Sequence, residues 1–230
     1  MFGGTGAVGA EVLKGLARAG VPTAFTWFRS AERARALAAE LSQRALQVDL
    51  GSAPATRAAL HELHASGLRP TLFIHCAAVI RSAALGELTD EDWRQAHAVN
   101  CQSAFIAVQA LAPAMVERKE GDVVLVSALD RTQSARLPVQ FAASQGALPA
   151  FAMALAKELG PNGVRANVVS LGILEEGLSR AVDPRLRDDY KNFSALRRLG
   201  SAAEAAKAIL WLALENTYIN GRVVPVNGGL

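Results

Sequence analysis

The sequence has little cysteine and no clusters of metal-binding residues. Its two cysteines, Cys76 and Cys101, are too few for a disulfide framework and do not form a CxxC pair. The four histidines show no metal-ligand spacing with other ligand-type side chains. We therefore expect no metal site and no disulfide-stapled fold.

Long runs of one charge sign are also missing. The formal net charge is +3, and the lysines and arginines form no basic stripe with interleaved aromatic residues. Such a stripe is typical of nucleic-acid binding, so we expect no nucleic-acid partner. No apolar run approaches the length of a membrane span, and no signal peptide precedes the first glycines, so we expect no membrane insertion and a cytoplasmic protein.

Short apolar segments alternate with longer amphipathic ones along all 230 residues. The predicted strands are Thr23–Phe28, Ala45–Val48, Thr71–Cys76, Val123–Ser127, Arg165–Ser170 and Arg222–Val226. The predicted helices are Gly9–Ala19, Ala31–Leu41, Ala53–Ala65, Glu91–Glu117, Gln140–Leu159 and Ala202–Glu215. This alternation predicts an α/β fold, a Rossmann-like doubly wound parallel sheet flanked by helices, forming a single domain over residues 1–230. The polar segment Leu174–Leu199, which contains Pro184, is a candidate substrate lid within that domain.

A glycine-rich loop opens directly into the first helix. Residues Gly3, Thr5, Gly6, Val8 and Gly9 are the candidate phosphate-side contacts of a dinucleotide. Glycines let the backbone approach a pyrophosphate, which the helix N-terminus then binds through its free N–H groups. The alternative, from this loop alone, is an ordinary turn before a helix.

Only Met1 and Phe2 precede this loop, although a dinucleotide loop normally follows a central strand. A missing central strand would leave ladder hydrogen bonds unmade. We therefore expect the numbered chain to start inside that strand, through truncation or a misassigned start codon. An upstream coding stretch rich in Val and Ile would support this expectation, and a stable, fully active 230-residue product would contradict it.

The end of the second predicted strand is basic. Arg29 and Ser30 follow it, with Arg33 close behind. An acidic residue at this place receives the ribose 2′-hydroxyl of NAD, whereas an arginine favours a 2′-phosphate. The residues therefore favour NADP(H), and the alternative is a solvated helix start.

Taken with the later segments, the whole chain resembles the short-chain dehydrogenase/reductase family, especially its 3-oxoacyl-acyl-carrier-protein reductase-like members. The segments that carry the resemblance are Asp49-Leu50, Ile74–Ala78, Val99-Asn100, Asn167–Gly172 and Tyr218–Leu230. The resemblance implies an NADP(H) site with further contacts from Asp49, Leu50, Cys76, Ala77, Ala78, Asn100, Gly172 and Ile173.

The catalytic segment departs from the family pattern. In the family a serine precedes a Tyr-x-x-x-Lys pair, in which the tyrosine donates a proton and the lysine lowers its pKa. Here Phe141 and Gln145 occupy the tyrosine and lysine positions, and Ala128 occupies the serine position, with Ser127 one residue earlier. Asn100 is the retained member of the catalytic set. Phenylalanine cannot donate a proton, and losing a general acid costs about 10²–10⁴ in rate.

Other residues are weak substitutes for the lost acid. Tyr190 lies in the candidate lid and could fold over the site, whereas Tyr218 is expected to pack before the last strand. His75 is expected to be a packed or cofactor-touching imidazole, and Ser144 to face away from the site.

Two functions remain open at this point. The first is an NADPH-dependent ketoreductase-type enzyme for a carbonyl or carrier-bound acyl substrate, with a non-standard proton source. The second is a catalytically silent subunit that pairs with an active homologue. The resemblance implies a dimer or tetramer through helices 91–117 and 140–159, whose apolar residues include Phe105, Val108, Leu111, Phe151 and Leu155. We expect at least half of these five to be ordinary core. A nucleotide-dependent sensor is a third reading with no feature of its own.

Overall fold

All six predicted strands form, and their paired neighbours are parallel. The computed structural model describes residues 1–128 and 137–230. The strands are β1 (Ala24–Trp27), β2 (Arg44–Gln47), β3 (Leu72–His75), β4 (Gly121–Ser127), β5 (Val164–Leu171) and β6 (Val223–Val226). They pair in the orders β1-β2 and β3-β4-β5-β6. The predicted fold class, a Rossmann-like parallel sheet, is therefore confirmed.

Met1 and Phe2 join the two groups of strands. The Met1 carbonyl accepts the Thr26 amide at 3.0 Å on the β1 side. On the β3 side, the Phe2 amide donates to the Ile74 carbonyl at 2.9 Å, and the Phe2 carbonyl accepts the Cys76 amide at 3.0 Å. These two residues therefore lie between β1 and β3, where a doubly wound sheet has its central strand.

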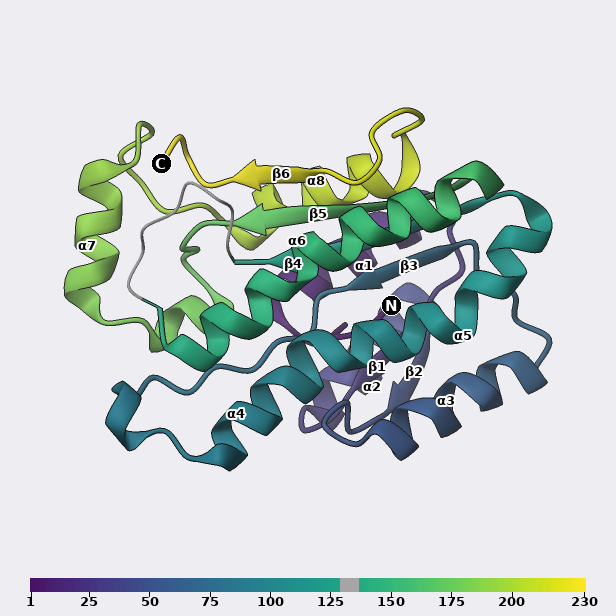
Figure 1. Cartoon of the computed structure of the whole chain (residues 1–230), viewed down its shortest axis with the longest axis horizontal. Coiled ribbons are helices and arrows are strands. Elements are labelled where there is room, and N and C mark those ends of the chain that lie inside the picture. Colours follow the sequence, from purple (N-terminus) through teal and green to yellow (C-terminus); the bar gives the residue numbers. More distant parts are fainter. Residues whose placement is uncertain (129–136) are drawn as a thin grey trace.

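Helices cover both faces of the sheet (Figure 1). They are α1 (Ala7–Arg18), α2 (Ala31–Leu41), α3 (Ala53–Ala65), α4 (Asp90–His97), α5 (Ser103–Arg118), α6 (Val139–Leu159), α7 (Pro184–Phe193) and α8 (Ala202–Leu214), with short turns η1 (Leu85–Glu87), η2 (Ala98–Gln102), η3 (Gly160–Asn162) and η4 (Gly177–Ala181). Successive strand residues alternate between the faces: Phe73 packs with α3, α5 and α6, and Ile74 packs with α1 and α8.

The helix predicted over Glu91–Glu117 is interrupted. Between α4 and α5 the chain makes a π-helical turn, η2, in which Asn100 is fully buried. The Ser103 hydroxyl donates to the Val99 carbonyl at 2.8 Å within this turn. A π turn inserts an extra residue and changes the direction of the side chains that follow, often at a functional site.

The candidate lid contains helical structure that its polar composition did not predict. It includes η4 and α7, and α7 lies beyond the carboxyl ends of the strands (Figure 1). Pro184 occupies the first turn of α7, where a missing N–H costs nothing, and the Asp183 carboxylate accepts the Arg185 amide at 2.8 Å.

Two helical stretches are long and apolar enough to pass a membrane-span test by length and composition. Asp90–Arg118 and Val139–Asn162 have the length and composition of a membrane span, contrary to our expectation that no run approaches that length. Each packs one face against the sheet, through residues such as Leu111 and Leu148. The opposite face keeps large apolar side chains in solvent, since Phe105 is 45% and Met153 is 47% exposed.

Candidate cofactor and active site

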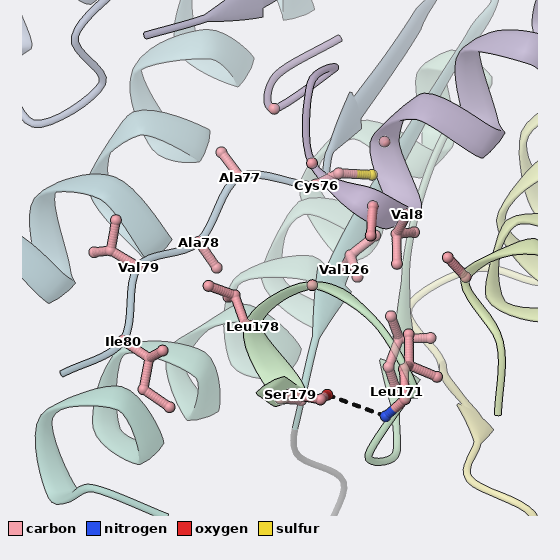
Figure 2. A pocket seen from close by; sticks show the side chains of 18 of the residues that line it. Val8, Cys76, Ala77, Ala78, Val79, Ile80, Val126, Leu171, Leu178 and Ser179 are labelled. Atoms are coloured by element: carbon pink, nitrogen blue, oxygen red, sulfur yellow. Dashed lines mark hydrogen bonds between the residues drawn. The ribbon is translucent and has the colours of Figure 1, made fainter. Parts of the chain in front are cut away.

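A cavity of about 960 Å³ lies at the carboxyl ends of the strands. The residues that follow β1, β2, β3, β4 and β5 all contribute to its wall, as does the loop before α1. Parallel strands in a doubly wound sheet place ligands at this edge. Figure 2 shows part of this wall, with Val8 of α1 next to Cys76, and Leu178 of η4 facing Ala78.

Two glycines of the loop, Gly3 and Gly9, lie in backbone contacts that leave no room for a side chain. Gly3 has φ +80°, and its amide donates to the Thr26 hydroxyl at 3.2 Å. A Cβ on Gly9 would lie 2.1 Å from the Gly3 carbonyl oxygen. The N-cap of α1 is Gly6, so no side chain caps the first-turn amides, which lie along the cavity wall. This arrangement fits the phosphates of a dinucleotide.

The wall beyond β1 is basic, as the sequence predicts. Arg29, Ser30 and Arg33 all line the cavity. The Arg29 guanidinium lies 5.6 Å from the centroid of the neighbouring Phe28 ring, a cation–π contact that favours one orientation. After β2, an Asp49 carboxylate oxygen accepts the Gly51 amide at 2.8 Å. These residues fit the adenosine half of NADP(H), with arginines available for a 2′-phosphate.

The predicted cofactor residues lie together, with one exception. The cavity is lined by Gly3, Thr5, Gly6, Val8, Gly9, Arg29, Ser30, Asp49, Leu50, Cys76, Ala77, Ala78, Gly172 and Ile173. Asn100 is absent from this wall, and its contact with the cofactor stays a prediction. It lies behind the wall, on the buried π turn.

Asn100 holds other parts of the site in place. Its Oδ1 accepts the Val79 amide at 2.7 Å, and its Nδ2 donates to the Val79 carbonyl at 3.0 Å and to the Ser144 hydroxyl at 2.9 Å. Val79 lines the cavity, and Ser144 lies on α6 between Phe141 and Gln145. Asn100 therefore connects the β3 loop to α6. Ser144 faces Asn100 and not the cavity, in line with the sequence prediction.

The three positions that the sequence predicts to be an altered catalytic set meet at the cavity wall. Ala128, Phe141 and Gln145 all line it, and the latter two are only 4% and 2% exposed. The Gln145 side-chain oxygen accepts the Ala128 amide at 3.0 Å, and the Ser127 hydroxyl donates to the Gln145 backbone carbonyl at 3.2 Å. The sequence had placed these positions together, and the geometry agrees.

The candidate replacement acids are otherwise engaged. Tyr190 lines the cavity, but its hydroxyl donates to the Asn227 carbonyl at 2.7 Å. Tyr218 is 97% exposed, so the prediction that it packs was wrong. His75 is fully buried outside the cavity wall, and burial lowers its pKa to about 4. Burial raises the pKa of the Cys76 thiol to about 12, which keeps it neutral.

Several wall residues carried no sequence signal. Gln95 on α4 reaches the wall from an ordinary polar helix, and Val79, Ile80, Leu137 and Leu178 make part of the wall apolar.

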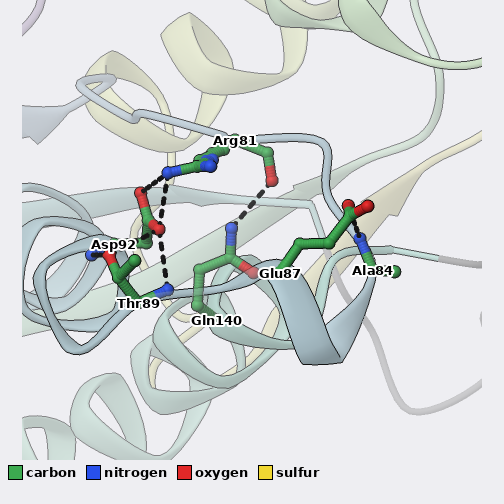
Figure 3. A network of polar contacts seen from close by, with 6 residues as sticks. All are labelled: Arg81, Ala84, Glu87, Thr89, Asp92 and Gln140. Carbon is green, nitrogen blue, oxygen red and sulfur yellow. Dashed lines mark hydrogen bonds and ion pairs between the residues drawn. The ribbon is translucent and has the colours of Figure 1, made fainter.

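A polar network fixes the loop that carries Val79 and Ile80 (Figure 3). In it, the Arg81 guanidinium binds the Asp92 carboxylate at 2.7 Å, and the Gln140 amide of α6 donates to the Arg81 carbonyl at 2.8 Å. Hydrogen bonds from Thr89 and Arg81 lower the pKa of Asp92 to about 2.

Comparisons with known proteins give a consistent family. A protein-family model described as enoyl-(acyl carrier protein) reductase matches residues 4–230. The 3-oxoacyl-(acyl-carrier-protein) reductase of Aquifex aeolicus is 27% identical, and the match covers 99% of this chain and 94% of that protein. A blue fluorescent protein from a metagenomic library, solved with NADPH, superposes with a TM-score of 0.91 at 26% identity, over 99% and 95% of the two chains. A short-chain dehydrogenase from Burkholderia cenocepacia, solved with NADP, gives 0.88 at 28% identity over the same shares.

Proposed function

Because the chain belongs to the short-chain dehydrogenase/reductase family, related to the 3-oxoacyl-acyl-carrier-protein reductases, we propose that it binds NADP(H) but lacks the family's acid-catalysed carbonyl reduction. Binding is supported by the uncapped amides of the glycine loop and by Arg29 and Arg33 at the other end of the cavity. Two of the similar structures were solved with NADPH or NADP, which supports the same cofactor. Bound NADPH would supply a hydride.

The proposed lack of acid-catalysed reduction is supported by the pair Phe141 and Gln145. Both are buried at the wall on one turn of α6, where the family resemblance puts the tyrosine and lysine. Neither side chain ionises, and phenylalanine has no proton to donate. The described wall residues include one tyrosine, Tyr190, and no lysine. We infer that a carbonyl reduced here takes its proton from a non-standard source, such as water or the substrate itself.

The experiment compares binding and turnover in one set of variants. NADPH binding is measured by fluorescence, and NADPH oxidation is followed with a β-ketoacyl thioester. We expect wild-type protein to bind NADPH and to oxidise it at a rate near the uncatalysed background. The triple variant Ala128→Ser, Phe141→Tyr, Gln145→Lys should gain measurable turnover, because it supplies an acid and a nearby charge.

A matched variant, Phe141→Leu with Gln145→Met, alters the same two positions without adding an ionisable group. It should stay inactive. Absence of NADPH binding at millimolar concentration would refute the binding half of the proposal. Wild-type turnover well above the uncatalysed background would refute the catalytic half.

A second candidate, a silent subunit that pairs with another chain of this fold, is favoured by the exposed face of α5 and α6. Phe105 and Met153 are nearly half exposed, and the Phe105 and Phe151 rings lie 6.3 Å apart on that face. Val108, Leu111 and Leu155 are buried in the core and leave this face to the other side chains. The partner would be a second copy or an active relative.

A further inference from the structure

The wall of the cavity changes character between its two ends. Arg29 follows β1, and Ile173 follows β5. Met1–Phe2, β3 and β4 lie between those two strands, which makes four strand-to-strand steps. At about 4.8 Å a step, this separation is on the order of 19 Å. The end of the cavity at β5 is therefore distant from the arginines that fit a 2′-phosphate.

The wall at the β5 end is mostly apolar. The described residues that follow β5 and lie in the lid line it with the apolar side chains of Ile173, Leu178, Val182 and the ring of Tyr190. Glu176 and Arg180 add charge, but the Glu176 carboxylate accepts the Ala202 amide at 3.0 Å, and Arg180 is exposed. A wall of this kind fits an uncharged, apolar molecule, because a charged group would lose its hydration without gaining a partner.

Tyr190 closes this end of the cavity. It is the buried residue of α7, and its ring belongs to an apolar cluster with Ile173 and Leu199. Its hydroxyl donates to the Asn227 carbonyl at 2.7 Å. A Cβ on Gly172 would lie 1.7 Å from this hydroxyl oxygen, so the ring fits because residue 172 is glycine. The side chain is thus held between the end of β5 and the turn that follows β6.

A second, smaller cavity of about 100 Å³ lies on the other side of Tyr190. Four residues line both cavities: Ile173, Leu174, Tyr190 and Ser201. Tyr190 has the largest side chain of the four, and it is the one that lies on α7. The smaller cavity continues toward α8 and the turn after β6, through Ala205, Asn227 and Gly228. The Tyr190 side chain is therefore a partition, and shortening it would join the two cavities.

We propose that Tyr190 is a specificity-determining residue, the end wall that limits the length of an uncharged, apolar chain bound at the β5 end of the cavity. The inference rests on the proposed function, in which NADP(H) fills the rest of the cavity. It adds a ligand class, a straight aliphatic chain with one uncharged polar group, and a residue that selects among such ligands by length. A bound chain gains affinity with each methylene that it buries and none from methylenes that find no room.

The test measures the dissociation constants of straight-chain methyl ketones, from 2-butanone to 2-decanone, by titration calorimetry on protein saturated with NADP⁺. NADP⁺ has no hydride to transfer, so the titration reports binding alone. For wild-type protein, affinity should rise about fourfold with each added methylene until the chain reaches Tyr190, and should then stop rising. Tyr190→Ala removes the partition, so the rise should continue to longer ketones. Tyr190→Leu, which stays apolar but is shorter than tyrosine, provides the same comparison if Tyr190→Ala fails to fold.

Tyr190→Phe and Leu199→Ala are the matched controls. Phenylalanine keeps the ring and removes the hydrogen bond to Asn227. Leu199 is 3% exposed and belongs to the same cluster as Tyr190, but it lines neither cavity. Leu199→Ala therefore loosens the cluster without shortening the wall. Both controls should keep the wild-type length limit.

Each outcome has a defined consequence. An unchanged length limit in the folded Tyr190→Ala or Tyr190→Leu variant overturns the inference, and so does the same extension in either control. Wild-type protein that binds no ketone of the series, or that gains affinity through to 2-decanone, also overturns it. If wild-type protein does not bind NADP⁺, the proposed function itself fails, and the same titrations on the free protein then decide the role of Tyr190.

Discussion

At the residue scale, His75 is a titratable group kept neutral inside the protein. Its ring is fully buried beside Phe2 and Phe73, and its Nε2 lies 2.8 Å from the Ser103 hydroxyl. Because that hydroxyl already donates to the Val99 carbonyl, Nε2 acts as the donor in this contact. The neutral imidazole thus connects the end of β3 to the π turn that positions Asn100.

This burial makes stability depend on pH in a defined direction. The pKa of His75 falls from 6.5 to about 4 on folding, so between these values the unfolded chain binds a proton that the folded protein does not. The free energy of unfolding should therefore fall as pH decreases from 6.5 to 4, by at most about 3 kcal/mol from this group. His75→Phe should remove this part of the pH dependence, as measured by urea unfolding at several pH values.

The variant also loses the bond to Ser103, so it should be less stable by about 1 kcal/mol at pH 7.5. Parallel stability curves for wild type and His75→Phe between pH 7 and pH 4 would show that His75 is not the group responsible.

Residue identity was easier to predict than residue environment. The sequence identified Asn100 as part of the site, but its backbone contacts to Val79 depend on a π turn that no local pattern marks. Tyr218 illustrates the same limit. Its position before a strand suggests packing, yet the side chain is 97% exposed. The exposure of a loop residue depends on which helices border the loop, and the local sequence does not give that.

At the element scale, the glycine loop gives a sharp test of backbone shape. A Cβ on Gly9 would lie 2.1 Å from the Gly3 carbonyl oxygen, so Gly9→Ala must displace the loop or α1. We expect a loss of about 1–3 kcal/mol in unfolding free energy, typical of overpacking, together with weaker NADPH binding. Thermal and chemical denaturation, with NADPH titration, measure both effects.

Gly6→Ala is the control for this experiment. Gly6 has φ −66° and ψ 166°, which alanine adopts freely, and an added Cβ would meet its nearest atom at 3.4 Å. Its stability should match wild type within about 0.5 kcal/mol. If Gly9→Ala is as stable as Gly6→Ala, the close approach of Gly3 and Gly9 does not constrain the loop.

Element boundaries followed from the sequence where local signals agree with the packing. The predicted bounds of Ala31–Leu41 and Ala53–Ala65 match α2 and α3 to the residue. The Ser52 hydroxyl caps α3 by accepting the Ala55 amide at 3.3 Å, whereas Ser30 precedes α2 without a side-chain capping bond. The segment Leu174–Leu199 was harder, since α7 is polar on most of its surface and buries only Tyr190. Hydrophobic periodicity is weak in such a helix, and Pro184 was ambiguous between a break and a first turn.

At the scale of the whole molecule, the position of the cavity could be inferred from the sequence, but the residues of its apolar wall could not. Parallel strands bring their carboxyl ends to one edge, so motifs scattered from Gly3 to Ile173 were predicted to converge, and they line one cavity. The apolar wall formed by Ile80, Leu137 and Leu178 depends on tertiary packing of loops. Neither spacing nor composition marks those residues.

The exposed face of α5 and α6 yields the last prediction. Apolar side chains on two long helices, with Phe105 and Met153 nearly half exposed, are costly in water unless a partner covers them. We expect wild-type protein to form a dimer or larger assembly, with a molar mass measured by light scattering after gel filtration. Phe105→Glu with Met153→Glu should yield the 24.2 kDa monomer, since burying two unpaired carboxylates opposes association.

Phe193→Glu is the control, because Phe193 is 76% exposed on α7, away from this face. Its assembly state should equal that of wild type. A wild-type protein that stays monomeric at tens of micromolar, or a double variant that keeps the wild-type mass, would refute self-association through this face. Co-purification of the chain with an active relative, abolished by the same two substitutions, would then assign the face to a heteromer. Gln145 and Met153 both lie on α6. An NADPH titration of the monomeric variant therefore tests whether loss of pairing changes the affinity for the cofactor.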